Sequence, residues 1–561
     1  MTPPTTLTQQ APLTDVEIAQ AHTLEPIQII AQRAGLPDNA VIGYGRNKAK
    51  IDISQTTTNP QGKLILVTGM SPTPAGEGKS TVLIGLADAI RAQGHSTIVA
   101  IREPSLGPVF GIKGGAAGGG YSQIVPMEDI NLHFTGDFHA ITGANNTLAA
   151  LIDNHIQHGN SLDIDPRRIT WQRCLDVNDR SLRHVITGLG GKAHGTPTET
   201  GFSITAASEI MAVLCLATSV EDLETRLANM VVAQSYQGQP ITAGDLHAQG
   251  ALTALLKEAL NPNLVQTLGG TPAFVHGGPF ANIAHGCNSL IATTTALSYA
   301  DVVLTEAGFG SDLGAEKFFD IKARAGGLDV AGCVIVATIR SLKYNGGAAK
   351  EALTAENIPA LAKGIINLEK HVRNVRKFGV EPIIALNLFS SDTAQEQDWM
   401  LSWAKEFGVG LYPVTVWANG GDGADNLAQA VLELEQDTPS HSLYDPSEGI
   451  EESISTIAQE IYGAHTVQWS KQARADLEYL KAHGWDGLPV CISKTQYSFS
   501  DDPTALGAAE GHTVHVRQLL PRIGAGFIVA LTGDVMTMPG LPKVPAAEKI
   551  SVDQGLIKGL F

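Results

Sequence analysis

One segment of this chain combines glycines, a lysine and a hydroxyl in the order that binds nucleotide phosphates. It follows an apolar run over residues 64–69 and reads Thr73-Pro74-Ala75-Gly76-Glu77-Gly78-Lys79-Ser80. In such a loop the backbone N–H groups point at phosphate oxygens, the lysine reaches the outer phosphates and the hydroxyl holds Mg²⁺. Thr73 stands where the usual pattern has its first glycine, and an ordinary Gly/Pro turn is the alternative. Because the loop, Lys79, Ser80 and the flanking elements agree, we predict an ATP phosphate loop.

A second glycine-rich stretch follows the next predicted strand. Arg102 and Glu103 follow the end of that strand, and shortly after them comes the run Gly111-Ile112-Lys113-Gly114-Gly115-Ala116-Ala117-Gly118-Gly119-Gly120-Tyr121. Each glycine adds conformational entropy that folding must remove, so such a run is expected where a ligand approaches the backbone closely. A flexible loop is the alternative. The charged residues within and beside the run favour a ligand site.

The elements that must position these residues alternate between strand and helix. Residues 80–91 have the apolar spacing of a helix, and strands are predicted at 64–68, 97–101, 302–305, 334–338, 383–387 and 527–532. This alternation predicts an α/β fold of the P-loop type, with a mostly parallel sheet covered by helices and additional smaller α/β domains. Ligands bind at the carboxyl ends of parallel strands. The loops that we expect to line the site are therefore 69–79, 102–121, 306–317, 340–347, 387–393 and 417–423.

Composition and charge argue against several other classes of protein. Hydrophobic residues make up 43% of the chain and charged residues 17%, which is typical of a globular protein rather than a disordered one. The net charge is −18 and no block of basic residues stands out, so we expect no nucleic-acid partner. The five cysteines form no C-x-x-C pair, which predicts buried free thiols in a reducing compartment. With no leader pattern and no apolar run long enough to cross a bilayer, we expect a cytoplasmic protein without membrane contact.

Beyond these single features, the motifs together resemble the formate–tetrahydrofolate ligase family in its single-function prokaryotic form. The glycine-rich run at 111–121 matches one family signature. A second signature is Val336-Ala337-Thr338-Ile339-Arg340-Ser341-Leu342-Lys343-Tyr344-Asn345-Gly346-Gly347, with Ser341 where the family usually has alanine. Further blocks match at 131–146, 274–288, 305–322 and 537–548, and the family's own phosphate loop also has threonine at position 73. The resemblance covers essentially the whole chain.

The resemblance implies an ATP-dependent ligase. Formate and MgATP would give formyl phosphate and ADP, and N10 of tetrahydrofolate would then attack the formyl carbon to give 10-formyltetrahydrofolate and phosphate. Lys79 would neutralise the phosphates, and Arg102, whose planar fork matches a carboxylate or an acyl phosphate, would hold formyl phosphate. Glu103 is predicted to share the catalytic role. Ser80 and Glu306 are the predicted Mg²⁺ ligands, with Glu103 and Asp137 as competing carboxylates.

The resemblance also assigns the folate, the other cofactors and the assembly. Phe389 and Trp417 match the family's folate-stacking aromatic residues, and burial in the core is the alternative for both. Leu388 and Asn419 stand where the family often has a basic residue, and Ser391 where it has threonine. The family is usually a homotetramer activated by K⁺ or NH₄⁺. Four histidines lie in matching blocks and are expected to make structural hydrogen bonds: His133, His139, His276 and His285.

The expected domain division follows from these roles. Residues 1–365 are predicted to form the domain that binds nucleotide and formyl phosphate, residues 366–520 the folate-side α/β part, and residues 521–561 a C-terminal segment that packs back on the core. Two other functions compete with the ligase: a P-loop switch ATPase that acts on a partner protein, and a scaffold without activity. The two signatures favour the ligase over the switch. The joint presence of Lys79, Arg102, Phe389 and Trp417 argues against the scaffold.

Overall fold

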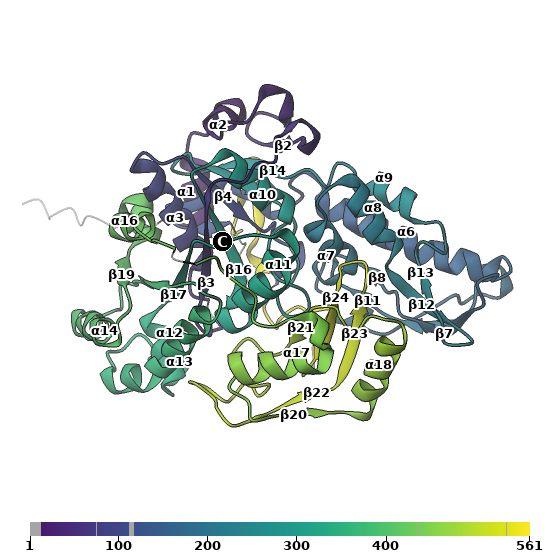
Figure 1. Ribbon diagram of the computed structural model, residues 1–561. Coiled ribbons are helices and arrows are strands. Elements are labelled where there is room, and N and C mark those ends of the chain that lie inside the picture. The colour runs from purple at the N-terminus through teal and green to yellow at the C-terminus, as the bar shows by residue number, and fades with distance from the viewer. Residues whose placement is uncertain (1–12, 75, 112–116, 437, 534–535, 561) are drawn as a thin grey trace, which may run out of the picture.

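A large sheet forms the centre of the protein. The computed structural model describes residues 13–74, 76–111, 117–436, 438–533 and 536–560. Within these residues the sheet has 12 strands, in the order β1-β2-β14-β15-β4-β16-β3-β17-β18-β19, with β6 pairing on β14 and β5 on β6 (Figure 1). Their bounds are β1 Val41–Gly43, β2 Ala49–Ile51, β3 Lys63–Gly69, β4 Thr97–Ile101, β5 Gly118–Gly119, β6 Ser122–Val125, β14 Asn263–Thr267, β15 Pro272–Val275, β16 Val302–Gly310, β17 Gly332–Ala337, β18 Pro382–Asn387 and β19 Leu411–Val414.

The run of strands from β15 to β19 is parallel at every pairing. The carboxyl ends of these strands therefore meet at one edge of the sheet, where the crevice of an open α/β sheet binds ligands. The predicted mostly parallel α/β fold is confirmed. The predicted phosphate loop follows β3, Arg102 follows β4, Glu306 lies in β16, and the loops with Phe389 and Trp417 follow β18 and β19.

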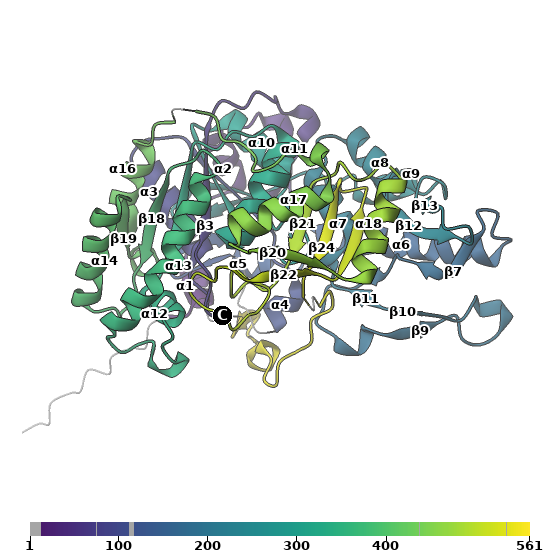
Figure 2. The ribbon, with the colours of Figure 1, turned by 60° about the horizontal axis from the view of Figure 1, so that its bottom comes forward.

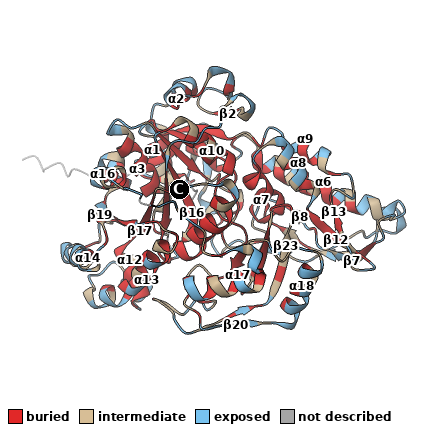
Figure 3. Ribbon diagram, in the orientation of Figure 1, coloured by how far each residue is buried: buried red, intermediate tan, exposed pale blue. Residues whose placement is uncertain are grey.

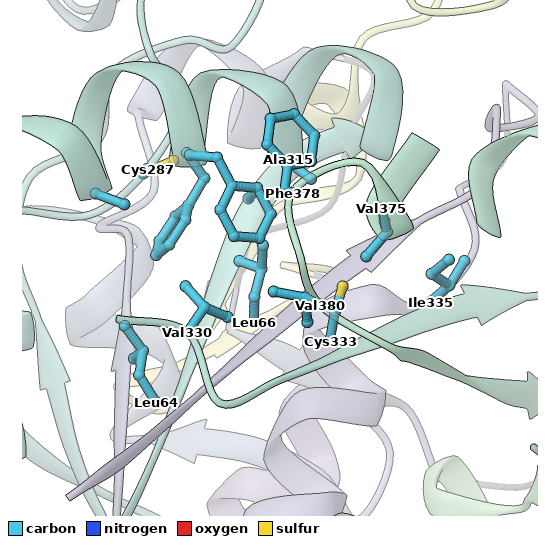
Figure 4. Packing of buried hydrophobic residues seen from close by; sticks show 14 of the residues in the cluster. Leu64, Leu66, Cys287, Ala315, Val330, Cys333, Ile335, Val375, Phe378 and Val380 are labelled. Carbon is cyan, nitrogen blue, oxygen red and sulfur yellow. The ribbon is translucent and has the colours of Figure 1, made fainter. Parts of the chain in front are cut away.

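Both faces of the sheet are buried, and successive side chains of each parallel strand point alternately to one face and the other. Leu64 and Leu66 of β3 pack into one apolar cluster, whereas Ile65 and Val67 pack into another on the opposite face. Figure 4 shows the first cluster, where Phe378 lies over the strands near Leu66 and Cys333. The helices packed against the first face include α10 Leu290–Tyr299, α12 Ile339–Asn345, α13 Ile358–Arg376 and α14 Ala394–Phe407, and those against the second include α3 Lys79–Ala92 and α16 Asp425–Leu432.

A separate lobe projects to one side of the sheet (Figure 1). Its apolar cluster is distinct from the two sheet faces. Its elements are α6 Asp137–Gln157, α7 Glu209–Leu216, α8 Val220–Ala228, α9 Gln249–Leu256, β7 Ile164–Ile169, β12 Val231–Ser235 and β13 Pro240–Thr242. Buried residues run through the large sheet and continue into this lobe, with exposed residues on the outer helices (Figure 3).

The later part of the chain forms small sheets beside the large one (Figure 2). Its elements are α17 Ile450–Thr456, α18 Lys471–Ala482, β20 Thr466–Trp469, β21 Val490–Ser493, β22 Thr513–Val516, β23 Gln518–Arg522 and β24 Phe527–Leu531. The short remaining elements are α1 Asp15–Ala21, α2 Ile27–Arg33, α4 Leu106–Phe110, α5 Met127–Asn131, α11 Arg324–Gly326, α15 Val416–Asn419, β8 Arg173–Cys174, β9 Val185–Thr187, β10 Thr198–Thr200, β11 Phe202–Ser203, β25 Ser551–Asp553 and β26 Leu556–Lys558.

The strand predicted at 527–532 is present in the later part of the chain. It forms β24, which pairs with β21 and β23 in a three-stranded sheet and not with the large sheet. Ile528 faces one apolar cluster and Phe527 another, so the strand is buried on both sides like those of the large sheet. An apolar run shows that a strand is buried, but it does not show which sheet contains it.

The predicted domain division stays a prediction, and two features cross its first boundary. Residues 365 and 366 both lie inside α13, and β18 and β19, which come after that boundary, pair in the same sheet as β3. The cysteines agree with expectation, because all five are free and buried: Cys174, Cys215, Cys287, Cys333 and Cys491.

Candidate functional site

The predicted phosphate loop joins β3 to α3 with the backbone turn that such a loop requires. Lys79 is the first residue of the 14-residue helix α3, and Gly78 before it has φ 72°, a left-handed conformation that favours glycine. A Cβ on Gly78 would lie 2.5 Å from Nδ2 of Asn387, which donates a 3.1 Å hydrogen bond to the Glu77 carbonyl. The loop is therefore closed against the end of β18. The first N–H groups of α3 lie at the same point, where an anion is favoured.

Glu77 braces the loop from inside. Its Oε1 accepts a 2.6 Å hydrogen bond from the Thr73 N–H, and its Oε2 accepts one from Oγ1 of Thr338 at the end of β17. Gly76 N–H donates to the Thr73 carbonyl at 3.1 Å, and Pro74 is exposed, whereas Ala75 lies outside the described residues. Both carboxylate oxygens of Glu77 are thus used within the protein. Glu77 therefore shapes the loop through contacts within the protein.

Two residues of α13 that the sequence analysis did not single out hold the start of the loop. Nε2 of His371 accepts a 2.8 Å hydrogen bond from the Ser71 N–H, and Asn367 Nδ2 donates to Ser71 Oγ at 3.0 Å. Nδ1 of His371 lies 2.7 Å from Ser311 Oγ. Burial lowers the pKa of His371 to about 4, so the ring is neutral and its proton resides on Nδ1. The only sequence signal was the i, i+4 spacing of these two polar residues on a helix.

Replacing His371 tests this support. In His371→Ala the buried Ser71 N–H loses its acceptor, which costs about 1–3 kcal/mol, so we expect the KM for ATP to rise about tenfold. His371→Gln keeps an acceptor of similar reach and should recover most of that loss. Steady-state kinetics with ATP varied, together with melting temperatures, measure the effect. A fall in melting temperature with an unchanged KM for ATP would show that His371 stabilises the fold only.

Charged side chains from β16 and from the segments that follow β3 and β4 meet beside the loop. Glu306 of β16 accepts a 2.8 Å hydrogen bond from Ser80 Oγ and forms an ion pair with Arg102, whose Nε lies 3.3 Å from Oε1. Nζ of Lys79 donates to the carbonyl of Ala307. Because β16 lies between β3 and β4, a residue more than 200 positions away is brought between Ser80 and Arg102.

The electrostatics of this cluster favour an anionic ligand. Glu306 is buried, and burial alone would raise the pKa of its carboxyl. The positive charges of Arg102 and Lys79, with the Ser80 hydrogen bond, outweigh that effect, so the pKa of Glu306 is lowered and the group is ionised. Two cations then face one carboxylate. The Arg102 side chain is 21% exposed, which leaves it within reach of a ligand.

Trp417 lies farther along the same edge of the sheet, in the short helix α15 after β19. Its side chain is exposed (44%), which excludes the alternative that it is a core residue. Its carbonyl accepts a 2.8 Å hydrogen bond from the Tyr121 N–H. Gly120 has φ 58°, and a Cβ there would lie 2.1 Å from that carbonyl oxygen and 2.8 Å from Cγ of the indole. The last glycines of the first signature therefore lie directly against Trp417.

Phe389 follows the neighbouring strand β18 and is half-buried. Its N–H donates to Oδ2 of Asp392 at 2.8 Å, which fixes the backbone of the loop. The guanidinium carbon of Arg340, from the first turn of α12, lies 3.6 Å from the centre of the ring. The two predicted folate-stacking aromatic residues thus follow adjacent strands, with the phosphate loop only two strands away from β18.

Comparisons with known proteins identify the family of the chain. The family model described as "Formate--tetrahydrofolate ligase" matches residues 13–561. The chain belongs to the formate–tetrahydrofolate ligase family. The protein of that name from Corynebacterium diphtheriae is 73% identical over 548 residues, which cover 98% of this chain and 100% of the relative. Those from Arthrobacter sp. and Staphylococcus aureus (strain JH9) are 58% and 56% identical, covering 98% of this chain and 99% and 100% of the relatives.

In this formate–tetrahydrofolate ligase family member, Glu103 stands apart from the phosphate-loop cluster. Its N–H donates to the Gly277 carbonyl at 2.7 Å, and its buried carboxyl has an oxygen, Oε2, with no hydrogen-bond partner among the described residues. Burial raises the pKa of Glu103 well above its usual range, and the nearby Asp137 carboxylate adds to this effect. Asp137, the other competing carboxylate, is paired with Lys50 at 2.7 Å and accepts from Asn263. Consecutive residues at a strand end point to opposite sides, which separates Glu103 from Arg102.

The four histidines of the family blocks lie in two settings. His276 is buried and bonded at both ring nitrogens, to Ser289 Oγ at 2.6 Å and to the Ala259 carbonyl at 2.7 Å, as expected for a structural role. His285 is also buried, and neither ring nitrogen has a partner among the described residues. His133 and His139 lie on the surface with their rings bonded to each other at 2.9 Å.

Two further properties of the described residues bear on ligands and location. They contain no group of three or more His, Cys, Asp and Glu side chains that could hold a metal ion. No helix in the described part of the chain has the length and apolar character needed to cross a membrane.

Proposed function

We propose that this protein joins formate to tetrahydrofolate at the expense of ATP, through formyl phosphate, to give 10-formyltetrahydrofolate, ADP and phosphate. The observation that carries the proposal is the cluster of Lys79, Ser80, Arg102 and Glu306 at a phosphate loop, on the same sheet edge as an exposed tryptophan and a half-buried phenylalanine. An anion site beside an aromatic site fits a phosphorylated intermediate that must meet a pterin. The names of the relatives support the same substrates.

In the first step a formate oxygen attacks the γ-phosphorus of ATP, an O–P bond forms and the bond to ADP breaks. Such a transfer is accelerated mainly by positioning and by charges aimed at the phosphoryl oxygens. Lys79, which donates to the Ala307 carbonyl, would exchange that acceptor for a phosphate oxygen. The Arg102 fork would hold formate and then formyl phosphate by two parallel hydrogen bonds. Lys79 and Arg102 both lie close to Glu306 beside the loop, where their charges would act on the same phosphoryl group.

Mg²⁺ is assigned to Ser80 and Glu306 on their chemistry. A hydroxyl and an ionised carboxylate, 2.8 Å apart at the end of the phosphate loop, are oxygen ligands of the kind this ion prefers. When bound, the ion neutralises charge on the phosphate oxygens. Glu306 is suited to this role because Arg102 and Lys79 keep it ionised while it is buried.

In the second step N10 of tetrahydrofolate attacks the formyl carbon. A C–N bond forms, the C–O bond to phosphate breaks, phosphate leaves and N10 loses its proton. Phe389 and Trp417 would hold the pterin by stacking, which orients N10 towards the acyl phosphate. Arg102 would neutralise charge on the departing phosphate. Glu103, buried and apart from this cluster, would not contact the reacting groups.

The remaining assignments rest on the family resemblance. We propose activation by K⁺ or NH₄⁺, assembly into a homotetramer and a cytoplasmic location. The buried Glu103 oxygen without a partner among the described residues is a group that suits a monovalent cation, because a cation would relieve the repulsion from Asp137.

Release of ADP tests the reaction. It is measured with formate and tetrahydrofolate added separately and together. The ligase predicts full turnover only when both are present, with 10-formyltetrahydrofolate formed in equal amount to ADP. A P-loop switch ATPase would release ADP without either substrate, and that result would overturn the proposal.

Replacing the two aromatic residues tests the folate site. In Phe389→Ala or Trp417→Ala, loss of stacking and of burial should raise the KM for tetrahydrofolate about tenfold or more and leave the KM for ATP nearly unchanged. Phe407→Ala is the matched control, since Phe407 is a half-buried aromatic residue of α14 that stacks on Trp403. It should lower the melting temperature without a folate-specific effect. If Phe389→Ala and Trp417→Ala behave like this control, neither ring binds folate.

A further inference from the structure

Arg340 covers one face of Phe389. Its guanidinium carbon lies 3.6 Å from the ring centre, which places the flat cation directly over the ring. A cation at this distance is attracted by the electrons of the ring face. Arg340 has no assigned role in the reaction described above. Because its guanidinium occupies this face of the ring, a pterin has only the opposite face on which to stack.

The surroundings of Arg340 are fixed by the phosphate loop on one side and the Phe389 loop on the other. Thr338 accepts from the Ser341 N–H at 3.0 Å and so begins α12, and the same hydroxyl donates to Glu77 of the phosphate loop. Arg340 lies in the first turn of that helix. On the other side, the Asp392 carboxylate accepts from the Phe389 N–H. β17, which ends just before Thr338, lies between β3 and β18, so Arg340 stands between the two halves of the site.

We propose that Arg340 is a positioning residue for folate, which holds the Phe389 ring so that the face away from the guanidinium stacks on the pterin. The proposal rests on the proposed function above. A half-buried phenylalanine at the end of a strand can rotate about two side-chain torsions, and stacking requires one orientation. The guanidinium fixes that orientation before folate binds, which reduces the ordering cost of binding. Arg340 acts through the ring and does not contact the phosphates.

A double-mutant cycle tests this coupling. Arg340→Met keeps much of the side chain's length and removes the charge. We expect it to raise the KM and the calorimetric Kd for tetrahydrofolate about three- to tenfold, with kcat and the KM values for ATP and formate within twofold of wild type. Arg340→Lys keeps a cation over the ring and should recover part of the loss. In the Phe389→Ala background, Arg340→Met should have no further effect on the Kd for tetrahydrofolate.

The chain offers a matched control in a second arginine–phenylalanine pair. Arg373 lies 5.6 Å from the ring centre of Phe407, away from the proposed folate loops. Arg373→Met should leave every kinetic parameter unchanged. This control separates the effect of removing a cation from any aromatic ring from the effect of removing Arg340 from the Phe389 ring.

Three results would overturn the proposal. An increase in the KM for ATP or formate in Arg340→Met, or an effect that persists in the Phe389→Ala background, would mean that Arg340 contacts an anionic ligand directly. An equal decline of all parameters with a lower melting temperature would mean a structural role.

Failure of the proposed function would be seen in a different experiment, because the wild-type protein would then release ADP without requiring tetrahydrofolate. Calorimetric titration of the wild-type and Arg340→Met proteins with tetrahydrofolate would still test the role of Arg340. If the wild-type protein does not bind tetrahydrofolate, both the proposed function and the role of Arg340 are overturned.

Discussion

Lys79→Ala is expected to reduce formate- and tetrahydrofolate-dependent turnover at least 100-fold while the protein stays folded. Lys79 opens α3 at the phosphate loop and is one of two cations that face Glu306. Removing a preorganised group that stabilises developing charge costs roughly 3–4 kcal/mol of transition-state stabilisation, which corresponds to 100-fold or more in kcat. ADP release at saturating substrates gives kcat, and the melting temperature reports folding.

Lys63→Ala is the matched control for this experiment. Lys63 is an exposed lysine at the opposite, amino-terminal end of the same strand β3, so it cannot reach the phosphate loop. Its replacement should leave kcat unchanged. A folded Lys79→Ala protein with near-normal kcat would remove Lys79 from the mechanism.

Arg102→Lys is expected to be nearly as damaging as Arg102→Ala, with a fall in kcat/KM for formate of about 100-fold in both. A lysine supplies one point charge, whereas a carboxylate or an acyl phosphate is held by the two parallel N–H groups of a guanidinium. The KM for ATP should change little, because the proposed function assigns the phosphates to the loop backbone and Lys79. Initial rates with formate varied and with ATP varied separate the two effects.

The pH profile of the Arg102→Ala protein gives a second readout. Arg102 helps to hold the pKa of Glu306 low against the effect of burial. Without it that pKa rises, so Glu306 takes up a proton at a higher pH and the acid limb of activity shifts upward. Arg373→Lys is the control, because Arg373 is an exposed residue of α13, and it should change neither the rate nor the pH profile.

Two results would contradict the role given to Arg102. If Arg102→Lys restores most of the activity, Arg102 supplies only a general positive field. If the Arg102 variants lose ATP binding, Arg102 belongs to the nucleotide site.

Residues that are neighbours in the chain could be assigned from the sequence because local geometry places them. An apolar strand, a turn with glycines and a helix that begins with a lysine and a hydroxyl can take few other forms. β3, the loop and α3 accordingly lie where they were predicted, and β4 spans 97–101 as expected. The family signatures gave the resemblance that the comparisons confirm. They could be recognised without a structure because they are contiguous.

Strand order was decided only by the tertiary structure, since periodicity shows that a strand is buried but not which strand lies beside it. β16 could be predicted as a strand, yet only its place between β3 and β4 puts Glu306 between Ser80 and Arg102. The same limit applies to β24, because its apolar run predicted a strand but not the three-stranded sheet that contains it. Glu103, next to Arg102 in the chain, lies with Lys50 and Asp137 instead of with Lys79, because consecutive residues at a strand end point to opposite sides.

The supporting residues were hidden from the sequence for a related reason. His371 holds the Ser71 N–H across 300 positions, and Arg340 covers Phe389 from a different strand end. A histidine or an arginine in a helix has no local pattern that reveals its distant partner, because the partner is chosen when the helix packs on the sheet. The sequence by itself therefore determined the family, the α/β class and the contiguous phosphate loop. The tertiary structure decided which distant charges and rings meet at that loop, because long-range packing brings together the carboxyl ends of separate strands.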